Sequence, residues 1–232
     1  TGISGGWAAK ELCENGLKTL VLERGRMVKH REDYPTANMD PWDFPNAGEP
    51  AIEDVMQQEK QARTGYTVKT ASKHWFVNDV DHPYNEVKRF DWMRRYHVGG
   101  RSIMWGRHSY RWNELDFAAN KNEGIAVDWP VRYKDIAPWY DKVESYIGIS
   151  GELLGLPQLP DGQFEPMMEL NCVEDHVRGK VAEHFDGRVI TAGRVAHINS
   201  NKRFDGDGRA RCQYRNRCIR GCPFGAYFSS VS

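Results

Sequence analysis

The sequence predicts an α/β fold, namely an incomplete Rossmann-like domain with loop-rich insertions. Glycines at the start of the chain precede a helical pattern, and a short apolar run that ends on an acidic residue follows it. Prolines and glycines then interrupt much of the remaining sequence. The chain has 232 residues, of which 40% are hydrophobic, so it is long enough to bury a core.

The start of the chain predicts a helix, a strand and an acid in the order of a dinucleotide-binding motif. Gly2 and Gly5 fit the second and third glycines of the pattern G-x-G-x-x-G. A helical pattern runs to Gly16, which we expect at the C′ position just beyond the helix. Residues 17–22 predict a short strand, and Glu23 follows at its end.

Each of these residue types has a physical role in holding a nucleotide. Gly2 lets the backbone approach a pyrophosphate, and Gly5 lets the helix pack closely on the strand. The helix N-terminus offers unpaired N–H groups and a positive dipole end. Glu23 can accept hydrogen bonds from ribose hydroxyls. The alternative is an ordinary glycine-rich turn before an amphipathic helix, and the strand and the acid at the right distance favour the motif.

The middle of the chain predicts loops and one short helix. Residues 27–50 are broken by four prolines, and residues 53–62 predict a helix. Two histidines and two aspartates between residues 74 and 82 lack a metal-ligand spacing, so we expect solvated loop side chains there. Gly99 and Gly100 lie among basic and aromatic residues. That pattern suits either a backbone pressed against a flat anionic ligand or an ordinary glycine turn with a basic surface.

Three further elements are expected in the second half. Residues 133–147 predict an amphipathic helix, residues 172–185 a second helix and residues 188–198 a strand. The apolar face of the first helix is expected to be core. Its members are Ile136, Trp139, Tyr140, Val143 and Tyr146.

Three of the five cysteines are closely spaced. Cys13 and Cys172 fall in expected helices, where we predict small buried side chains. Cys212, Cys218 and Cys222 form the pattern C-x5-C-x3-C. An odd count argues against a pure disulfide framework, and zinc would need a fourth ligand that does not follow in the sequence. An iron–sulfur cluster, a zinc site, and free or disulfide-bonded cysteines all stay open.

The neighbours of these cysteines favour the cluster. A proline follows the last cysteine, as is common at iron–sulfur sites, and a three-iron cluster needs only three protein thiolates. Four arginines could offset the negative charge of such a cluster. They are Arg211, Arg215, Arg217 and Arg220.

The order of these motifs resembles the glucose-methanol-choline (GMC) oxidoreductases. The glycine motif with its acid is followed by H-V-G-G-R-S-I-M-W-G, by D-W-P-V-R-Y-K-D-I-A-P-W-Y and by C-x5-C-x3-C-P-F-G-A. The resemblance is greatest to the bacterial branch that holds the flavin subunits of sugar and sugar-acid dehydrogenases. It covers nearly the whole chain and implies an FAD-binding Rossmann-like domain. The implied parts are a nucleotide-binding segment (1–26), a flavin loop (94–112) and an iron–sulfur cysteine loop (205–228).

The resemblance also implies the cofactors and the residues that hold them. FAD would be the main cofactor, and a [3Fe-4S] cluster would be held by the three closely spaced cysteines. We add four neighbours of the implied residues as further candidates. The cofactor-binding candidates are Gly2, Ser4, Gly5, Glu23 and Arg24 for the ADP half and Val98, Gly99, Gly100, Ser102, Trp105 and Gly106 for the flavin and pyrophosphate.

The activity implied by the resemblance is oxidation of a CH–OH group of a sugar or polyol. Electrons would pass from flavin through the cluster to a cytochrome c subunit, and a small chaperone-like subunit is a second implied partner. Two alternatives stay open, namely a nicotinamide-dependent dehydrogenase and a non-enzymatic zinc-stabilised binding module. We expect a fragment truncated at both ends, without the family's catalytic His and most of the substrate domain, and inactive by itself.

Composition and family likeness also bear on location. Basic and acidic residues number 32 each, which gives no reason to expect nucleic acid as a partner. No apolar run reaches the roughly 18 residues of a membrane span, and no signal peptide is recognised. The resemblance implies the periplasm, and a cytoplasmic location stays open.

Overall fold

The computed structural model describes residues 1–200 and 208–231. The chain divides into two compact units, each of which is described by itself. Unit 1 comprises Thr1–Trp105, Tyr214–Gly225 and Ser229–Ser232, and unit 2 comprises Gly106–Gln213 and Ala226–Phe228.

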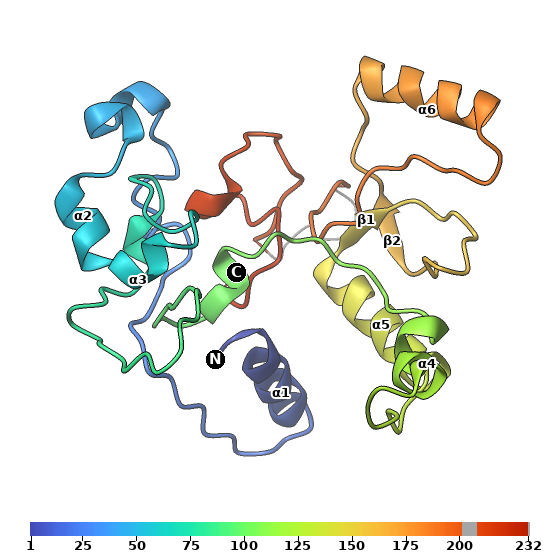
Figure 1. Ribbon diagram of the computed structural model, residues 1–232, viewed down its shortest axis with the longest axis horizontal. Helices are drawn as coiled ribbons and strands as arrows, with labels where there is room; N and C mark the ends of the chain where they lie inside the picture. The colour runs from blue at the N-terminus through green and yellow to red at the C-terminus, as the bar shows by residue number, and fades with distance from the viewer. Residues whose placement is uncertain (201–207, 232) are drawn as a thin grey trace. The chain divides into compact units, whose positions relative to one another are not determined.

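Unit 1 contains three α-helices joined by long loops and short 3₁₀ turns (Figure 1). The helices are α1 (Ile3–Glu14), α2 (Ile52–Gln57) and α3 (Glu59–Ala62). The first helix is confirmed, and Gly16 follows it with a φ of 79°, in the left-handed region that glycine favours. There its N–H donates to the Cys13 carbonyl (2.9 Å) and the Leu17 N–H donates to the Leu12 carbonyl (3.0 Å), which ends the helix.

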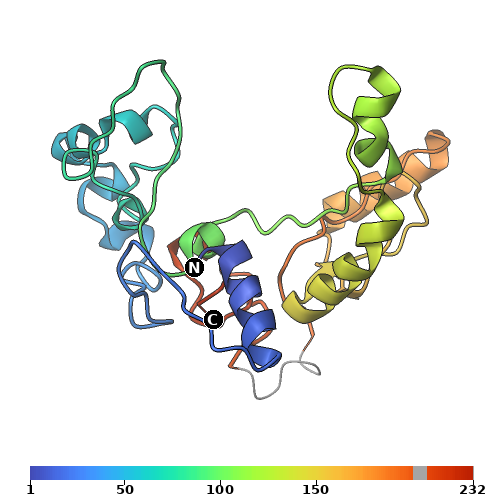
Figure 2. The ribbon, with the colours of Figure 1, turned by 90° about the horizontal axis from the view of Figure 1, so that it is seen from below.

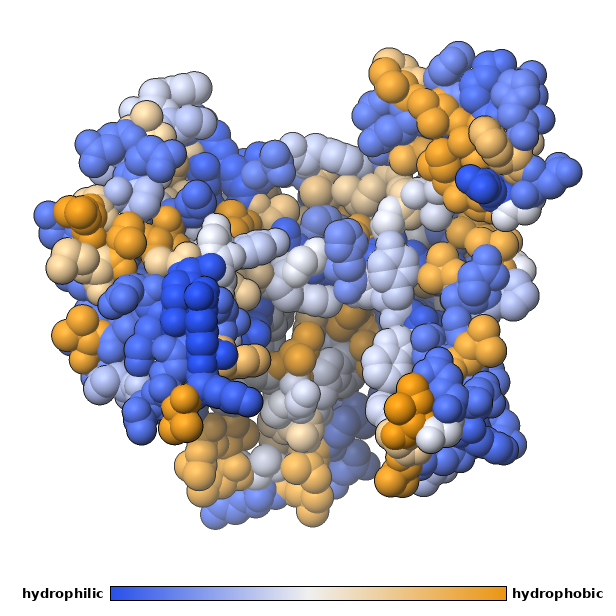
Figure 3. Space-filling view, viewed as in Figure 1, coloured by the Kyte–Doolittle hydropathy of each residue, from blue (hydrophilic) through white to orange (hydrophobic). Residues whose placement is uncertain are grey.

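The predicted strand over residues 17–22 is not formed. The segment is extended, but no ladder joins it to another described segment, and a strand is stable only when its backbone groups are paired. Its side chains face solvent, with Leu20 84% and Leu22 79% exposed. Hydrophobic surface is visible over this segment at the lower edge of Figure 3.

The core of unit 1 forms around Trp75, which is 1% exposed. Tyr34 and His97 meet its indole edge-on, with ring centroids 6.0 and 5.5 Å away. Ile103 packs in the same cluster and is fully buried. The residues on either side of the Gly99–Gly100 turn, which we call the glycine turn, are thereby packed against the loop that follows α1.

The described residues of unit 2 form three helices and a small sheet. They are α4 (Glu114–Glu123), α5 (Tyr133–Ile147) and α6 (Cys172–His184), with β1 (Ile149–Gly151) and β2 (Phe164–Pro166) paired in parallel. The expected bounds of α5 are confirmed, and α6 is confirmed with its end one residue earlier than expected, at His184. The sequence did not predict α4 or the two strands, although Asn113 caps α4 by accepting from the Leu115 and Asp116 N–H groups.

The buried face of α5 differs from the predicted one. Trp139 is 60% and Tyr146 49% exposed, whereas Glu144 and Ile147 are buried. The buried Arg111 explains the rotation, because its guanidinium donates to both oxygens of Glu144 at 2.9 and 2.5 Å. A charge pair of this quality draws the carboxylate inward.

The predicted strand over residues 188–198 is also wrong. Only single bridges occur there, joining Val195 to Ser150 and to His108, and His197 to Tyr227. The described fold is therefore a set of helices with one two-stranded parallel sheet, compatible with part of an α/β domain. Within the described ranges, no helix combines the length and hydropathy of a membrane span.

Candidate functional site: the glycine loops and the cysteine loop

The two predicted glycine motifs are neighbours in unit 1. The Gly99 N–H donates to the Thr1 hydroxyl (3.3 Å), across 98 positions of sequence. A Cβ added to Gly100 would lie 3.3 Å from the Gly2 Cα, so the two backbones are in close contact. Figures 1 and 2 both place the start of α1 beside the 3₁₀ turn Gly100–Ile103.

The N-terminus of α1 is open toward a ligand. Gly2 is the N-cap, and no side chain caps the helix or places a negative charge in its first turn. A Cβ added to Gly2 or Gly5 would find no atom within 4 Å, and Ser4 is exposed. Free N–H groups, a positive dipole end and open space together suit a phosphate.

Glu23 lies beside this helix N-terminus. The Thr1 hydroxyl donates to its carboxylate, and the Gly25 N–H donates to the other oxygen at 3.0 Å. The Thr1 hydrogen bond is the main cause that lowers the pKa of Glu23 to about 2, so this side chain is an ionised acceptor at neutral pH. Arg24 stacks over the Tyr96 ring at 3.9 Å.

A short backbone pairing holds the Glu23 segment against the glycine turn. The Arg26 N–H donates to the Tyr96 carbonyl (3.3 Å), and the Val98 N–H donates to the Arg26 carbonyl (2.9 Å). Gly25 is required there, because any Cβ would overlap the Tyr96 backbone. The acid and the glycine turn are therefore held in one arrangement.

The glycine turn is closed by serines. The Ser102 hydroxyl donates to the Gly99 carbonyl (2.7 Å) and accepts from the Ser230 N–H (2.9 Å). Ser102 is buried, so its hydroxyl serves the turn itself. Trp105 is half-buried in unit 1, and Gly106 is exposed and belongs to unit 2. The role of Ser230 was missed, because no local pattern links positions 128 residues apart.

The part of the cysteine loop in unit 1 (Tyr214–Gly225) is held in place by hydrogen bonds from arginines. Arg215 donates to the Ala37 carbonyl (3.2 Å), Arg220 donates to the Met39 carbonyl (2.7 Å), and Arg217 pairs with Asp40. These three arginines were expected to offset the charge of a cluster. In the structure they anchor the loop to residues 37–40.

Tyr34 packs on the same loop. A Cβ added to Gly221 would lie 2.5 Å from the Tyr34 ring, so only glycine allows this contact. Its φ of 92° also favours glycine. Burial, with a smaller contribution from Cys222, raises the pKa of Tyr34 to about 12. Its hydroxyl lies 3.0 Å from the Nδ1 of His30.

The three predicted [3Fe-4S] ligands fall in different units, and the ligand set stays a prediction. Cys212 belongs to unit 2, whereas Cys218 and Cys222 belong to unit 1. Among the described residues, no three Cys, His, Asp or Glu side chains gather to hold a metal ion. Residues 205–207 of the predicted loop lie outside the described residues.

The remaining two cysteines are exposed rather than buried. Cys13 lies on α1 and Cys172 begins α6, as expected from the helical patterns, but each faces solvent. None of the residues of α1 or α6 is buried, so small side chains on these helices have no core to enter. The prediction of small core residues at these positions is wrong.

Comparison with known proteins shows which proteins the chain is similar to. No protein-family model matches it. It is 27% identical to a 2-methyl-1,2-propanediol dehydrogenase of Mycolicibacterium austroafricanum, over 69% of the chain and 25% of that protein. It is 23% identical to the fructose dehydrogenase large subunit of Gluconobacter japonicus, over 99% of the chain and 40% of that protein. The chain is similar to GMC-type flavin dehydrogenases.

A third relative agrees with this similarity and with the expected resemblance. The gluconate 2-dehydrogenase flavoprotein of Pantoea cypripedii is 27% identical over 63% of the chain and 24% of its own length. The chain thus spans between a quarter and two fifths of the length of these flavin dehydrogenases. These relatives are oxidoreductases that act on alcohol groups.

Proposed function

We propose that this chain forms part of an FAD-dependent dehydrogenase that oxidises a CH–OH group of a sugar or polyol. One observation carries the proposal. The open N-terminus of α1, the ionised Glu23 and the Gly99–Gly100 turn lie side by side in unit 1. A dinucleotide-binding site needs three features together. They are hydrogen-bond donors to the phosphates, an acceptor for the ribose hydroxyls and a backbone that the cofactor can approach closely.

The residues present fit the ADP half of FAD. The N–H groups at Gly2, Ser4 and Gly5 would hold the pyrophosphate, and Glu23 would accept from ribose hydroxyls. The neighbouring Val98–Gly100 backbone would face the cofactor. Bound FAD would supply an acceptor for the hydride of the substrate C–H bond. We assign no described residue to the base that takes the hydroxyl proton.

The test of this proposal is the cofactor that the full-length protein carries. We expect a flavin absorbance spectrum, and its bleaching when a sugar or polyol is added without oxygen. Bleaching by a panel of fructose, gluconate and a diol would define the substrate class. A colourless protein that reduces NAD would contradict the proposal and support the nicotinamide-dependent alternative.

The electron acceptor is a separate part of the proposal. The [3Fe-4S] cluster and a cytochrome c partner come from the family resemblance, and the C-x5-C-x3-C spacing is their support. Iron with labile sulfide in the anaerobically purified protein, lost in Cys218→Ser, would support the cluster. Zinc without iron would support the binding-module alternative. A protein that contains neither iron nor zinc would contradict both the cluster and the zinc-stabilised module.

Subunits and location complete the proposal. The names "large subunit" and "flavoprotein" of two relatives favour a multisubunit complex. We propose a small chaperone-like subunit beside the cytochrome, and a periplasmic location. Co-purification from a periplasmic extract tests both, and recovery of the protein in the cytoplasm alone would contradict the location.

A further inference from the structure

Ser230 lies between the two glycine motifs of unit 1, although it is more than a hundred residues from either in sequence. A Cβ added to Gly6 on α1 would lie 3.3 Å from the Ser230 Cβ. Toward the glycine turn, the Ser230 N–H donates to the Ser102 hydroxyl at 2.9 Å, and the two hydroxyl oxygens are also 2.9 Å apart. Ser230 therefore contacts both elements that border the proposed nucleotide site.

The hydroxyl of Ser230 completes the hydrogen bonds of the glycine turn. The Ser102 hydroxyl gives its own proton to the Gly99 carbonyl at 2.7 Å, so Ser230 is the donor between the two serines. The Ser230 hydroxyl also lies 3.3 Å from the Gly99 carbonyl, which is a second acceptor within its reach. The position of Gly99 therefore depends on both serines.

Gly6 is the helix residue that makes room for this contact. Its N–H already donates to the Gly2 carbonyl at 2.8 Å, so it is not one of the free donors at the start of α1. A methyl group at 3.3 Å would crowd the Ser230 Cβ, since carbon atoms pack best about 3.5–4.0 Å apart. At the neighbouring Gly5, an added Cβ would meet no atom of the described residues within 4 Å. The missing side chain at Gly6 thus serves the approach of Ser230.

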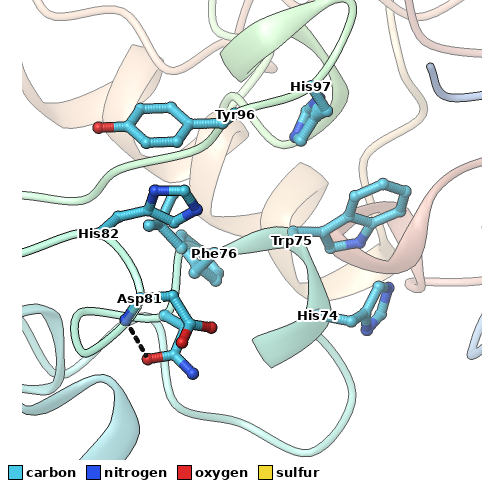
Figure 4. Close-up of a pocket in the computed structure, with 9 residues that line it drawn as sticks. His74, Trp75, Phe76, Asp81, His82, Tyr96 and His97 are labelled. Atoms are coloured by element: carbon cyan, nitrogen blue, oxygen red, sulfur yellow. Dashed lines mark hydrogen bonds between the residues drawn. The ribbon is translucent and has the colours of Figure 1, made fainter. Parts of the chain in front are cut away.

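The segment that leads into the glycine turn is only partly packed. His97 is 3% exposed, and its ring centroid lies 5.5 Å from that of Trp75. A pocket of about 180 Å³ adjoins the same segment, and His82, Tyr96 and His97 are among the side chains that line it (Figure 4). Because open space adjoins these residues, their packing alone does not fix where the turn lies. The contacts of Ser230 supply a second point of attachment.

We propose that Ser230 is a positioning residue of the nucleotide site, which holds the glycine turn at a fixed distance from the start of α1. This inference rests on the proposed function, because it concerns the site to which FAD is assigned. Ser230 acts through Gly99, Ser102 and Gly6, and it needs no contact with the cofactor. Without its hydroxyl the spacing between the two glycine motifs would vary, and binding would then have to select the correct spacing.

The test is fluorescence titration of the full-length protein with FAD, after its own flavin has been removed. Ser230→Ala deletes the hydroxyl but keeps the N–H that donates to Ser102. We expect the dissociation constant of FAD to rise about fivefold, which corresponds to the loss of one hydrogen bond.

Thr64→Val is the matched control for a merely structural role. It removes a hydroxyl that donates to the Gln61 carbonyl at 2.8 Å within unit 1, outside the proposed site. Urea denaturation should show a loss of stability in both variants, whereas only Ser230→Ala should weaken FAD binding. If Ser230→Ala lowers stability and leaves the dissociation constant unchanged, as Thr64→Val should, the positioning role is overturned.

A second set of variants tests the contact on α1. Gly6→Ala should displace Ser230 and raise the dissociation constant of FAD at least about fivefold, although alanine itself favours a helix. In a Ser230→Gly background no Cβ is left to crowd, so Gly6→Ala should have no further effect on binding. An equal effect of Gly6→Ala in both backgrounds would overturn the proposed contact.

The unsubstituted protein separates this inference from the proposed function. If it carries no flavin and binds no FAD, the proposed function is contradicted and the role of Ser230 falls with it. If it binds FAD and Ser230→Ala binds FAD equally well, only the role of Ser230 is contradicted.

Discussion

Glu23 shows how local hydrogen bonds fix the charge and the orientation of one carboxylate. Its hydrogen bonds from Thr1 and Gly25 favour the ionised form and fix the orientation of the carboxylate. The sequence predicted the acid, because its distance from the glycines is set by one helix and one extended segment. It did not predict the contact with Thr1, which depends on how the chain turns back after α1.

Replacing Glu23 with Gln should weaken FAD binding. The neutral amide is a poorer acceptor for ribose hydroxyls, so we expect the dissociation constant to rise about tenfold. Fluorescence titration of the purified chain with FAD measures this. Glu14→Gln is the matched control, since Glu14 lies on the exposed end of α1 and pairs only with Lys10 among the described residues. Equal affinities in the two variants would argue against the ribose contact.

Gly99 and Gly16 provide a matched test of close packing. Both have positive φ, of 81° and 79°, so alanine strains either backbone by about 1 kcal/mol. A Cβ at Gly99 would also lie 2.6 Å from a Val231 methyl carbon, whereas one at Gly16 would meet nothing. Gly99→Ala should therefore lower the free energy of unfolding by about 1–3 kcal/mol more than Gly16→Ala. Chemical denaturation compares them, and equal losses would show that the turn tolerates a methyl group.

At the scale of elements, α1, α5 and α6 were predictable, whereas α4 and the strands were not. The bounds of α5 and α6 follow from local periodicity, with Gly148 after α5 and Asn171 before α6 as their end signals. A strand exists only when a distant segment pairs with it. Residues 17–22 and 188–198 have strand-like composition, yet the described chain gives them no ladder.

The buried face of α5 depends on one ion pair that periodicity does not reveal. Arg111 and Glu144 are both buried, and the guanidinium also reaches Asp141 at 2.5 Å. Desolvation by burial acts to lower the pKa of Arg111. Its hydrogen bonds to the two carboxylates outweigh this effect and keep the pKa above its usual value. The carboxylate also accepts from the Gln163 N–H at 3.0 Å, which ties α5 to the segment before β2.

Glu144→Gln should therefore destabilise unit 2. Removing one charge of a buried pair leaves the guanidinium partly unpaired, and we expect a loss of about 3 kcal/mol in the free energy of unfolding. Glu183→Gln is the control. Its salt bridge with Lys180 lies on the surface of α6, so the change should stay within about 0.5 kcal/mol. Similar losses for the two variants, measured by urea denaturation, would contradict this account.

At the scale of the molecule, the structure brings the two glycine motifs together, whereas the cysteine ligand set stays a prediction. The glycine motifs carry their own geometry, since a helix start and a tight turn are set by nearby residues. The three cysteines are close in sequence, but Cys212 donates its N–H to Ile198 in unit 2 while the other two follow Tyr34 and the arginine anchors in unit 1. Tertiary contacts, rather than spacing, decide where they lie.

Stability should fall as the pH is lowered from about 6.5 to about 4. Burial lowers the pKa of His74 and of His197 from 6.5 to about 4 in the folded chain. The unfolded chain therefore binds more protons in this window, and stability rises with pH across it. Thermal unfolding across this range should show the slope, and the double variant His74→Gln, His197→Gln should flatten it. An unchanged slope in the double variant would assign the effect to other groups.

The Ser102–Ser230 bond has a consequence for biosynthesis. A ribosome delivers residues 106–213 before the 214–231 stretch that unit 1 requires, since Arg217 and Ser230 complete contacts with Asp40 and Ser102. Most of unit 2 can therefore fold while unit 1 is still incomplete. At that stage the cluster around Trp75 lacks Val231, which packs against it in the folded chain. Co-translational folding then proceeds from unit 2 to unit 1, which leaves apolar surface of unit 1 available to a chaperone until residues 214–231 have emerged.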